Sequence, residues 1–245
     1  MNVTPIGFGA FKIGRNQKIK YPSEYELPVI EEVRLLLNGI LDLGINYIDT
    51  APAYGLSEER IGECVSHRRS EFVLSTKVGE NFEDGESVID FSEDAVRSSI
   101  HRSFERLRTD VLDMVFIHSD GSDLTILNDT PTVSILQGFK DAGTAKGIGL
   151  SAKTVEGARQ SLDWADAIMV EYHLNDRSFE PVMQEASDAG KSVMVKKGLS
   201  SGWLDPAEAI RFVVSNPCVT SLVIGGLNLD HMQENLIAVQ SARDS

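Results

Sequence analysis

The chain of 245 residues is 42% hydrophobic and carries a formal charge of −14, from 23 basic and 37 acidic residues. This length and apolar content suit one large domain over residues 1–245, and so acidic a surface argues against general nucleic-acid binding. With only 2 cysteines, no apolar secretion signal at the start and no run able to span a bilayer, we expect a soluble cytoplasmic protein without a membrane partner.

Strand-like and helix-like segments alternate along the whole chain. Short apolar runs predict strands at 6–8, 46–49, 72–77, 113–118, 146–150, 167–171, 192–195 and 220–224. Helical spacing of apolar residues predicts helices at 28–43, 58–67, 92–107, 131–142, 154–164, 179–189, 205–214 and 229–239. Ser57 and Ser92 are expected to cap their helices, and 119–129 is expected to be a polar loop.

Eight strand–helix units of roughly 30 residues are the length expected for parallel strands joined by helical crossovers. Several of the strands are almost entirely apolar, as strands buried on both faces should be. No G-x-G-x-x-G motif opens a helix after an early strand, which weakens the alternative of an open doubly wound sheet. The fold class predicted is therefore α/β, a (β/α)8 TIM barrel whose closed, parallel eight-stranded sheet is surrounded by helices.

Four ionisable side chains lie at or just beyond the ends of three consecutive predicted strands. They are Asp49, Tyr54, Lys77 and His118. Each has an ordinary structural interpretation, such as a turn-capping carboxylate, a surface phenol, a lysine extending to solvent or a hydrogen-bonded structural imidazole. Because active sites of this fold lie at the carboxyl ends of the strands, all four are expected to meet at one rim. A carboxylate and a phenol on one strand-to-helix loop suit proton transfer.

The residues at these strand ends carry a family resemblance. Residues 44–58 read Gly-Ile-Asn-Tyr-Ile-Asp-Thr-Ala-x-x-Tyr-Gly-x-Ser-Glu, and are followed by Ser-Thr-Lys at 75–77 and Asp-x-x-x-Ile-His at 113–118. This pattern resembles the aldo-keto reductases, and the resemblance extends from Gly7-x-Gly9 through 147–151 to the Gly-Gly pair at 225–226. It implies a (β/α)8 barrel that uses a nicotinamide cofactor to reduce aldehydes and ketones, with the four residues as its catalytic tetrad.

The chemistry of the four side chains fits such a reduction. Tyr54 would donate the proton to the carbonyl oxygen, and Lys77 would stabilise the phenolate and lower its pKa from about 10. Asp49 would keep Lys77 charged and oriented. His118 would hydrogen-bond the carbonyl oxygen and polarise it.

The resemblance places the cofactor along the other strand ends. The residues expected there are Gly9, Ser151, Met169, Lys196, Lys197, Gly198, Leu199, Gly225, Gly226, Leu227, Asn228, His231, Glu234 and Asn235. The chain departs from the family at Ala152 and Met169, where an Asn and a Gln usually hold the carboxamide. It also departs at Lys196, where an aromatic residue commonly stacks on the nicotinamide, and at Leu227, where an Arg often reads the 2′-phosphate.

These departures leave two interpretations, local variation with Met169 as barrel filler, or altered cofactor binding. Lys196 and Lys197 are expected to supply the positive patch that an anionic cofactor needs, unless they are an ordinary solvated pair beside Glu171. Gly225 and Gly226 allow close backbone approach at the start of the last helix, which suits a phosphate. The family implies NADPH, with NADH possible.

The substrate side is less specific. Phe11 and Lys12 follow the first strand, and Trp203 lies on the loop after the seventh. Because only residues 240–245 follow the last predicted helix, we expect an open, poorly selective pocket for small aldehydes. The spacing of the histidines favours no metal site. Two alternatives remain: a non-catalytic cofactor-binding or regulatory protein on the same barrel, and a Schiff-base lyase with Lys77 or Lys196 as the amine.

Overall fold

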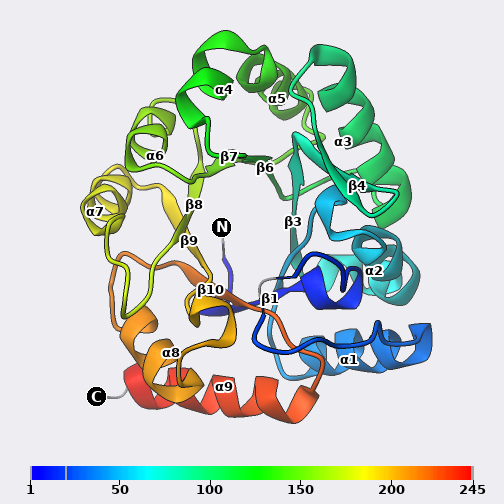
Figure 1. Cartoon of the computed structure of the whole chain (residues 1–245), viewed down its shortest axis with the longest axis vertical. Coiled ribbons are helices and arrows are strands. Elements are labelled where there is room, and N and C mark those ends of the chain that lie inside the picture. Colours follow the sequence, from blue (N-terminus) through cyan, green and yellow to red (C-terminus); the bar gives the residue numbers. More distant parts are fainter. Residues whose placement is uncertain (1, 20, 244–245) are drawn as a thin grey trace.

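The architecture is a closed barrel of parallel strands, seen in a computed structural model that describes residues 2–19 and 21–243. Around the barrel the strands follow the order β1-β10-β9-β8-β7-β6-β3-β2, so that neighbours in sequence are neighbours in space (Figure 1). The strands are β1 (Ile6–Gly9), β2 (Tyr47–Asp49), β3 (Val73–Val78), β6 (Met114–His118), β7 (Ile148–Ser151), β8 (Ala167–Glu171), β9 (Ser192–Lys196) and β10 (Ser221–Ile224). The predicted (β/α)8 barrel is confirmed.

Helices form the outer ring, and the view down the barrel shows them surrounding the strands (Figure 1). They are α1 (Ile30–Asp42), α2 (Ser57–Val65), α3 (Glu93–Leu107), α4 (Asp123–Asp129), α5 (Thr132–Asp141), α6 (Val155–Ser161), α7 (Glu180–Asp188), α8 (Pro206–Val214) and α9 (Leu229–Arg243). Short 3-10 helices follow β1 (η1, Ala10–Ile13), β2 (η2, Pro52–Tyr54), α2 (η3, Ser66–Glu71) and β9 (η4, Ser200–Gly202). The apolar stripe predicted for α1 is buried against the strands, as its spacing requires.

Alternation of side chains along each strand decides what fills the barrel. Successive residues point to opposite faces, so one parity faces the helices and the other faces the barrel interior. The interior contains a buried apolar cluster of Tyr47, Met114, Phe116, Ala167, Met169 and Met194. Two residues further along the same strands, on the same face, come Asp49, His118, Glu171 and Lys196. The barrel is therefore apolar in its middle and polar at the carboxyl ends of its strands.

Glycines make room for the aromatic side chains of this interior. A Cβ on Gly7 would collide with the ring of Tyr47, and a Cβ on Gly149 would lie 2.8 Å from Cε1 of Phe116. Both glycines have the inward parity of their strands, so the rings occupy the space that their missing side chains leave. The glycines of β1 and β7 are thus explained by packing in the floor of the site.

The structure differs from the predictions at four places. An antiparallel hairpin, β4 (Glu80–Glu83) and β5 (Glu86–Ile89), follows β3 and was not predicted. The expected polar loop at 119–129 contains α4. Neither expected serine caps its helix through its side chain: Ser57 is the first residue of α2 and donates to Ala10 O (2.9 Å).

The last difference concerns the C-terminus. The helix α9 extends to Arg243, four residues beyond its predicted end, so the segment expected to follow it as a tail is mostly helical. The pocket prediction built on that tail stays a prediction. Among the described residues, no helix is both long and apolar enough to cross a membrane.

Candidate active site

Three of the tetrad residues reach one end of the barrel because they stand at the carboxyl ends of their strands, and the fourth, Tyr54, lies on the loop after β2. Asp49 is the last residue of β2 and His118 the last of β6, while Lys77 is the penultimate residue of β3. Tyr54 ends η2, directly above β2. Since these strands are parallel neighbours, the four side chains meet at one rim of the mouth.

A buried ion pair forms the base of this rim. Lys77 Nζ lies 2.8 and 2.7 Å from the two carboxylate oxygens of Asp49, and donates to Thr50 O at 2.8 Å. Ser75 Oγ donates to Asp49 Oδ1 at 2.7 Å. Lys77 is 1% and Asp49 3% exposed. Burial lowers the pKa of Lys77, and the charge of Asp49 opposes that shift. Such a pair is rigid because every charge has partners that it would lose on moving.

Tyr54 lies over the ion pair. Lys77 Nζ is 4.8 Å from the centroid of the Tyr54 ring, and the His118 ring stands edge-on to it at 6.1 Å. Phe11 packs against the other side of the phenol at 5.1 Å. The loop is held from behind by Arg15, which donates from Nη1 to Ala53 O at 2.9 Å. The phenol is therefore turned toward Lys77 and His118 and is only partly exposed.

The expectation that Lys77 lowers the pKa of Tyr54 is wrong for this arrangement. Burial raises the pKa of the phenol well above 10, and the carboxylates of Asp49 and Glu80 raise it further, whereas Arg15 opposes them. The positive charge of Lys77 is neutralised by Asp49 at contact distance, so little of it acts on the phenol. At neutral pH Tyr54 is thus a protonated group, as a proton donor must be.

His118 closes the rim. Its Nδ1 lies 3.1 Å from Glu80 Oε2, within ion-pair distance but without the alignment of a hydrogen bond. Burial lowers the pKa of His118 well below 6.5, and the nearby charges of Lys77, Lys196, Lys153 and Arg15 lower it further. At neutral pH the ring is therefore uncharged.

The rim opposite, formed by β7 to β9, contains the half-buried Lys196. Lys196 Nζ donates to Ser151 Oγ at 2.8 Å and to Ala152 O at 2.9 Å. Burial lowers the pKa of Lys196 to about 7, helped by the positive charges of Lys197, Lys77 and Lys153. The amine lies at the end of β7, next to Ala152, whose side chain is apolar. Lys196 therefore faces the mouth, on the side away from Tyr54.

The other residues expected at this rim either pack in the apolar interior or form an ion pair. Met169 is 1% exposed and belongs to the apolar interior cluster, in agreement with its interpretation as barrel filler. Lys197 is ion-paired with Glu171, which is the ordinary interpretation of that lysine. Gly198 is buried where a Cβ would collide with Leu222, and Leu199 packs on the hydrophobic core. These residues shape the rim from below.

At the end of β10 the backbone is not covered by side chains. A Cβ on Gly9 would lie 3.5 Å from Gly225 N, and a Cβ on Gly225 would lie 3.0 Å from Gly9 O, so the two strand ends approach closely. Gly225 is exposed, Gly226 and Leu227 are half-buried, and α9 begins just beyond them. This glycine pair leaves a shallow surface without side chains, of the kind that a phosphate group needs.

The start of α9 is partly satisfied by the chain itself. Asn228 Oδ1 accepts from the backbone N–H of Asp230 at 2.7 Å and of His231 at 3.4 Å. His231 and Glu234 are exposed, while Asn235 is buried with only a 4.0 Å contact from its amide to Met232 Sδ. A buried amide with so weak a partner, beside the open glycine pair, fits the polar edge of a nucleotide.

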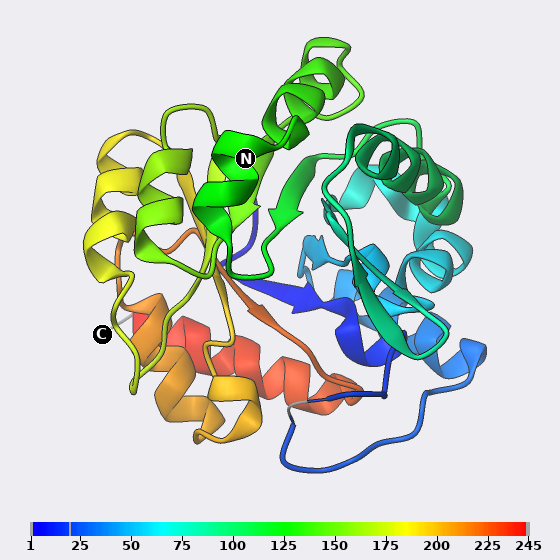
Figure 2. The ribbon, with the colours of Figure 1, turned by 45° about the horizontal axis from the view of Figure 1, so that its top comes forward.

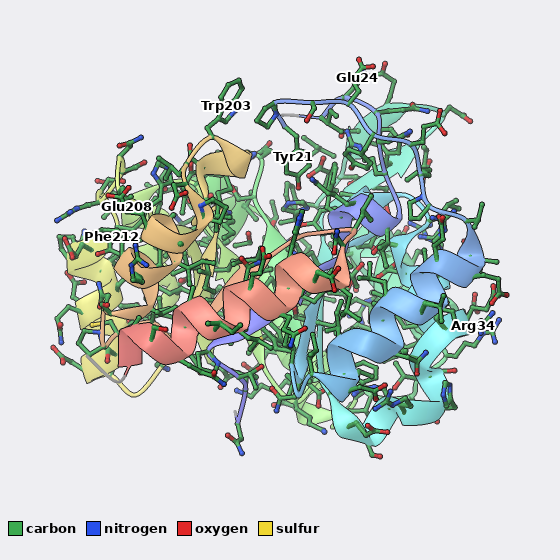
Figure 3. All side chains as sticks on the ribbon, turned by 90° about the horizontal axis from the view of Figure 1, so that it is seen from below. Tyr21, Glu24, Arg34, Trp203, Glu208 and Phe212 are labelled. Atoms are coloured by element: carbon green, nitrogen blue, oxygen red, sulfur yellow. The ribbon has the colours of Figure 1, made fainter. Side chains whose placement is uncertain are left out.

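The substrate side of the mouth is lined from the first and seventh loops. Phe11 and Lys12 lie in η1, and the ammonium of Lys12 stands 4.4 Å above the Tyr21 ring. Trp203 is 69% exposed and projects from the loop after η4 into solvent (Figure 3). A Cβ on Gly202 would lie 3.5 Å from Pro22 Cδ, so the loops after β1 and β9 touch each other.

Two contributors to the site were missed by the sequence analysis. Glu80 reaches His118 from the hairpin, and Arg15 holds the loop that carries Tyr54. The hairpin had a signal: Asp84 and Gly85 have φ of 51° and 80° between two residues in register, the conformation that an Asp-Gly hairpin turn adopts. Figure 2 shows this hairpin beside η1. The guanidinium carbon of Arg15 lies 3.7 Å from the centroid of the Phe82 ring.

Comparisons with known proteins agree with this geometry. A family model described as the aldo/keto reductase family matches residues 5–209. A solved Pseudomonas aeruginosa protein, described as a candidate aldo-keto reductase, is 40% identical, with a TM-score of 0.91 over 99% of this chain and 92% of its own. L-galactose dehydrogenase of Arabidopsis thaliana is 25% identical over 98% of this chain and 85% of its own length.

A more distant structure shows the same fold. The holo form of an aldo-keto reductase from Bacillus halodurans has a TM-score of 0.83 at 23% identity, over 98% of this chain and 88% of that one. The chain therefore belongs to the aldo/keto reductase family, whose members are oxidoreductases that use nicotinamide cofactors.

Proposed function

We propose that the protein reduces small aldehydes or ketones to alcohols, with NADPH as the preferred hydride donor and Tyr54 as the proton donor. The observation that carries this proposal is the packing of a protonated phenol between a buried Lys77–Asp49 ion pair and a neutral imidazole. Four chemically different groups from separate parts of the chain converge on one space at the barrel mouth. No structural requirement of the barrel explains such a convergence.

The residues of the chain act on the carbonyl oxygen. His118 hydrogen-bonds this oxygen and polarises the carbonyl, and Tyr54 transfers its proton there as negative charge develops. The pKa of Tyr54 is high, but an alkoxide is a stronger base than a phenolate, so the transfer is favourable. The Lys77–Asp49 pair, which also binds Thr50 O, fixes the start of the loop that carries Tyr54, while the charge of Arg15 favours the phenolate that Tyr54 becomes. The cofactor supplies the hydride when it is bound.

Residues of the opposite rim would hold the cofactor. Ser151 and Lys196 offer polar groups to the nicotinamide end, while Gly225 and Gly226 offer backbone N–H groups to a phosphate. His231, Glu234 and Asn235 line the first turns of α9 beyond them. The preference for NADPH over NADH follows the family's habit alone, because the chain has Leu227 where an Arg would read the 2′-phosphate.

The direction of reaction and the substrate are part of the proposal. The Arabidopsis relative is named as a dehydrogenase of a sugar, and the same four side chains serve oxidation and reduction by microscopic reversibility. A panel of aldehydes with NADPH or NADH, and of sugars with the oxidised cofactors, would identify the substrate class. One strongly preferred carbonyl would contradict the prediction of an open, poorly selective pocket.

The test of the mechanism is Tyr54→Phe. Removing the phenolic hydroxyl removes the proton donor, so turnover should fall roughly 10²- to 10⁴-fold. The circular dichroism spectrum, the melting temperature and cofactor binding measured by fluorescence should stay close to those of the unaltered protein. Cofactor binding without turnover of any carbonyl by the unaltered protein would instead favour a non-catalytic, cofactor-binding role.

A second candidate is Schiff-base chemistry at Lys196. An amine with a pKa lowered to about 7 is partly unprotonated at neutral pH, as a nucleophilic amine must be. Lys77 is the weaker choice, because Asp49 and Thr50 O occupy its ammonium protons. Borohydride treatment in the presence of an aldehyde, followed by peptide mass spectrometry, would place any adduct on one of these lysines.

A further inference from the structure

Glu80 is directed to the barrel mouth by the geometry of the hairpin that it begins. Strand β3 ends at Val78, and Gly79 follows with φ of 100°, in a turn where a Cβ would collide with the Phe91 ring. Glu80 is paired in register with Ile89, so the Asp84-Gly85 turn also fixes its position. Glu80 therefore returns over the rim that contains Lys77, three residues earlier in the chain.

There the carboxylate meets the inner nitrogen of His118. Glu80 Oε2 is 3.1 Å from Nδ1, and the exposed fractions of the two side chains are 19% and 17%. Nδ1 is closed off from solvent and has no hydrogen-bond partner in the described structure, because the carboxylate is close but not aligned with it. A small rotation of the carboxyl group would supply this alignment. Nε2 is then the ring nitrogen that can reach a substrate.

The charges around His118 give this contact its significance. Lys77 on β3, Lys196 on β9, Lys153 after β7 and Arg15 after η1 all act against protonation of the imidazole. The phenol of Tyr54 is neutral, and the carboxylate of Asp49 is occupied by Lys77. Glu80 is thus the acidic group placed to counter four positive charges at this ring.

We propose that Glu80 is a positioning residue for His118, an inference that rests on the proposed function. Its carboxylate accepts the Nδ1 proton as a hydrogen bond and so fixes one tautomer of the ring. In the free site the neutral ring leaves Nε2 unprotonated, so the proton that makes Nε2 a donor to the carbonyl oxygen is taken up when the substrate binds, and Glu80 balances the charge of the imidazolium that forms. Loss of Glu80 would leave the ring free to flip or change tautomer, with its charged form unsupported.

The experiment compares Glu80→Gln with Glu83→Gln. Glu83 lies on the same hairpin, is exposed and pairs in register with Glu86, so its substitution removes one carboxylate without touching His118. Nitrogen-15 NMR of the histidine rings, with His118 assigned by its absence in His118→Gln, reports tautomer and titration directly. In Glu80→Gln the titration midpoint of His118 should move to lower pH by about 1 pH unit, and Nδ1 should lose its fixed proton.

Kinetics supply the second readout. With any carbonyl that the protein reduces, Glu80→Gln should lower kcat roughly tenfold or more with little change in KM, and Glu83→Gln should change neither. Glu80→Asp, which keeps the charge, should recover part of kcat. Melting curves of the three variants show whether the hairpin stays folded.

Two results would overturn the inference. One is an unchanged His118 tautomer and titration midpoint in Glu80→Gln. The other is an equal loss of kcat in Glu80→Gln and Glu83→Gln. Failure of the proposed function is a separate result, since it would appear as absence of turnover in the unaltered protein, while the NMR comparison would still test the contact.

Discussion

The two sides of the barrel mouth hold their polar groups in different ways. On the side of β2, β3 and β6, the charges of Lys77 and Asp49 are paired with each other and buried. On the side of β7 to β10, the amine of Lys196 hydrogen-bonds to the neutral Ser151 Oγ and Ala152 O, and the end of β10 is bare glycine backbone. The first side is a closed network, whereas the second presents groups that await a partner.

This difference fits the two tasks of the proposed function. Proton transfer needs groups fixed in relation to one another before substrate arrives, and a satisfied buried network supplies that. Binding of a large anionic cofactor needs free donors and open backbone, which a satisfied network would not leave. The departures from the family pattern, at Ala152, Met169, Lys196 and Leu227, all fall on the second side. We infer that the chemistry is constrained on one side while cofactor contacts vary on the other.

The largest expected effect comes from breaking the closed network with Lys77→Met. This substitution leaves the Asp49 carboxylate buried and unpaired, so the free energy of unfolding should fall by about 3–5 kcal/mol. Urea denaturation at neutral pH would measure it. Asp49→Asn combined with Lys77→Met removes both charges and should recover part of the loss.

An exposed pair supplies the control for that experiment. Arg97 and Glu93 on α3 are 2.8 Å apart but half exposed, so Arg97→Met should change the free energy of unfolding by about 0.5 kcal/mol or less. Equal losses in Lys77→Met and Arg97→Met would show that the rim is no more constrained than the surface.

The second prediction concerns a positive charge added beside the glycine pair at the end of β10. Leu227→Arg places a guanidinium beside the glycine pair, and a charge-assisted contact with a 2′-phosphate should tighten NADPH binding by about tenfold. NADH lacks this phosphate, so its affinity should hardly change. Fluorescence titration with both cofactors measures the ratio, and Leu227→Gln controls for loss of the leucine. An equal gain for NADH would mean that the new charge acts on the pyrophosphate.

The sequence predicted the closed side well because its signals are local. Asp49, Lys77 and His118 stand at the ends of apolar runs, and Tyr54 follows one of them on its loop, so the strand pattern and the barrel topology together determine their place. Alternation within the strands also separates the apolar interior, as at Met169, from the polar ends, as at Lys196. These features require no knowledge of distant contacts.

What was missed depends on contacts between distant segments. Glu80 meets His118 across 38 positions of the chain, and only the hairpin turn at Asp84-Gly85 indicated that Glu80 would return to the mouth. The helix α4 was read as a loop because its polar residues have buried roles: Asp123 Oδ2 accepts from the backbone of Lys153 and Thr154 at 3.0 and 2.7 Å. The raised pKa of Tyr54 likewise depends on its burial and on the carboxylates of Asp49 and Glu80, which lie near it only in the folded chain.

The last prediction tests whether the half-buried amine of Lys196 lowers the stability of the folded protein. The folded pKa of Lys196 is about 7, below its unfolded value of about 10.4, so between these values the unfolded chain binds more protons than the folded one. The contribution of Lys196 to stability therefore rises with pH from 7 toward 10, by less than the limit of about 1.4 kcal/mol per pH unit for one proton.

Lys196→Met isolates this contribution. Below pH 7, where the half-buried Lys196 is charged, the free energy of unfolding of Lys196→Met should compare most favourably with that of the unaltered protein, and this advantage should decline as the pH rises toward 10. Urea midpoints at several pH values measure the slope. Lys191→Met, just before the start of the same strand, controls for the loss of one positive charge. A flat difference between Lys196→Met and the unaltered protein would mean that Lys196 is as well solvated as a surface lysine, and the contrast between the two sides of the mouth would lose its electrostatic part.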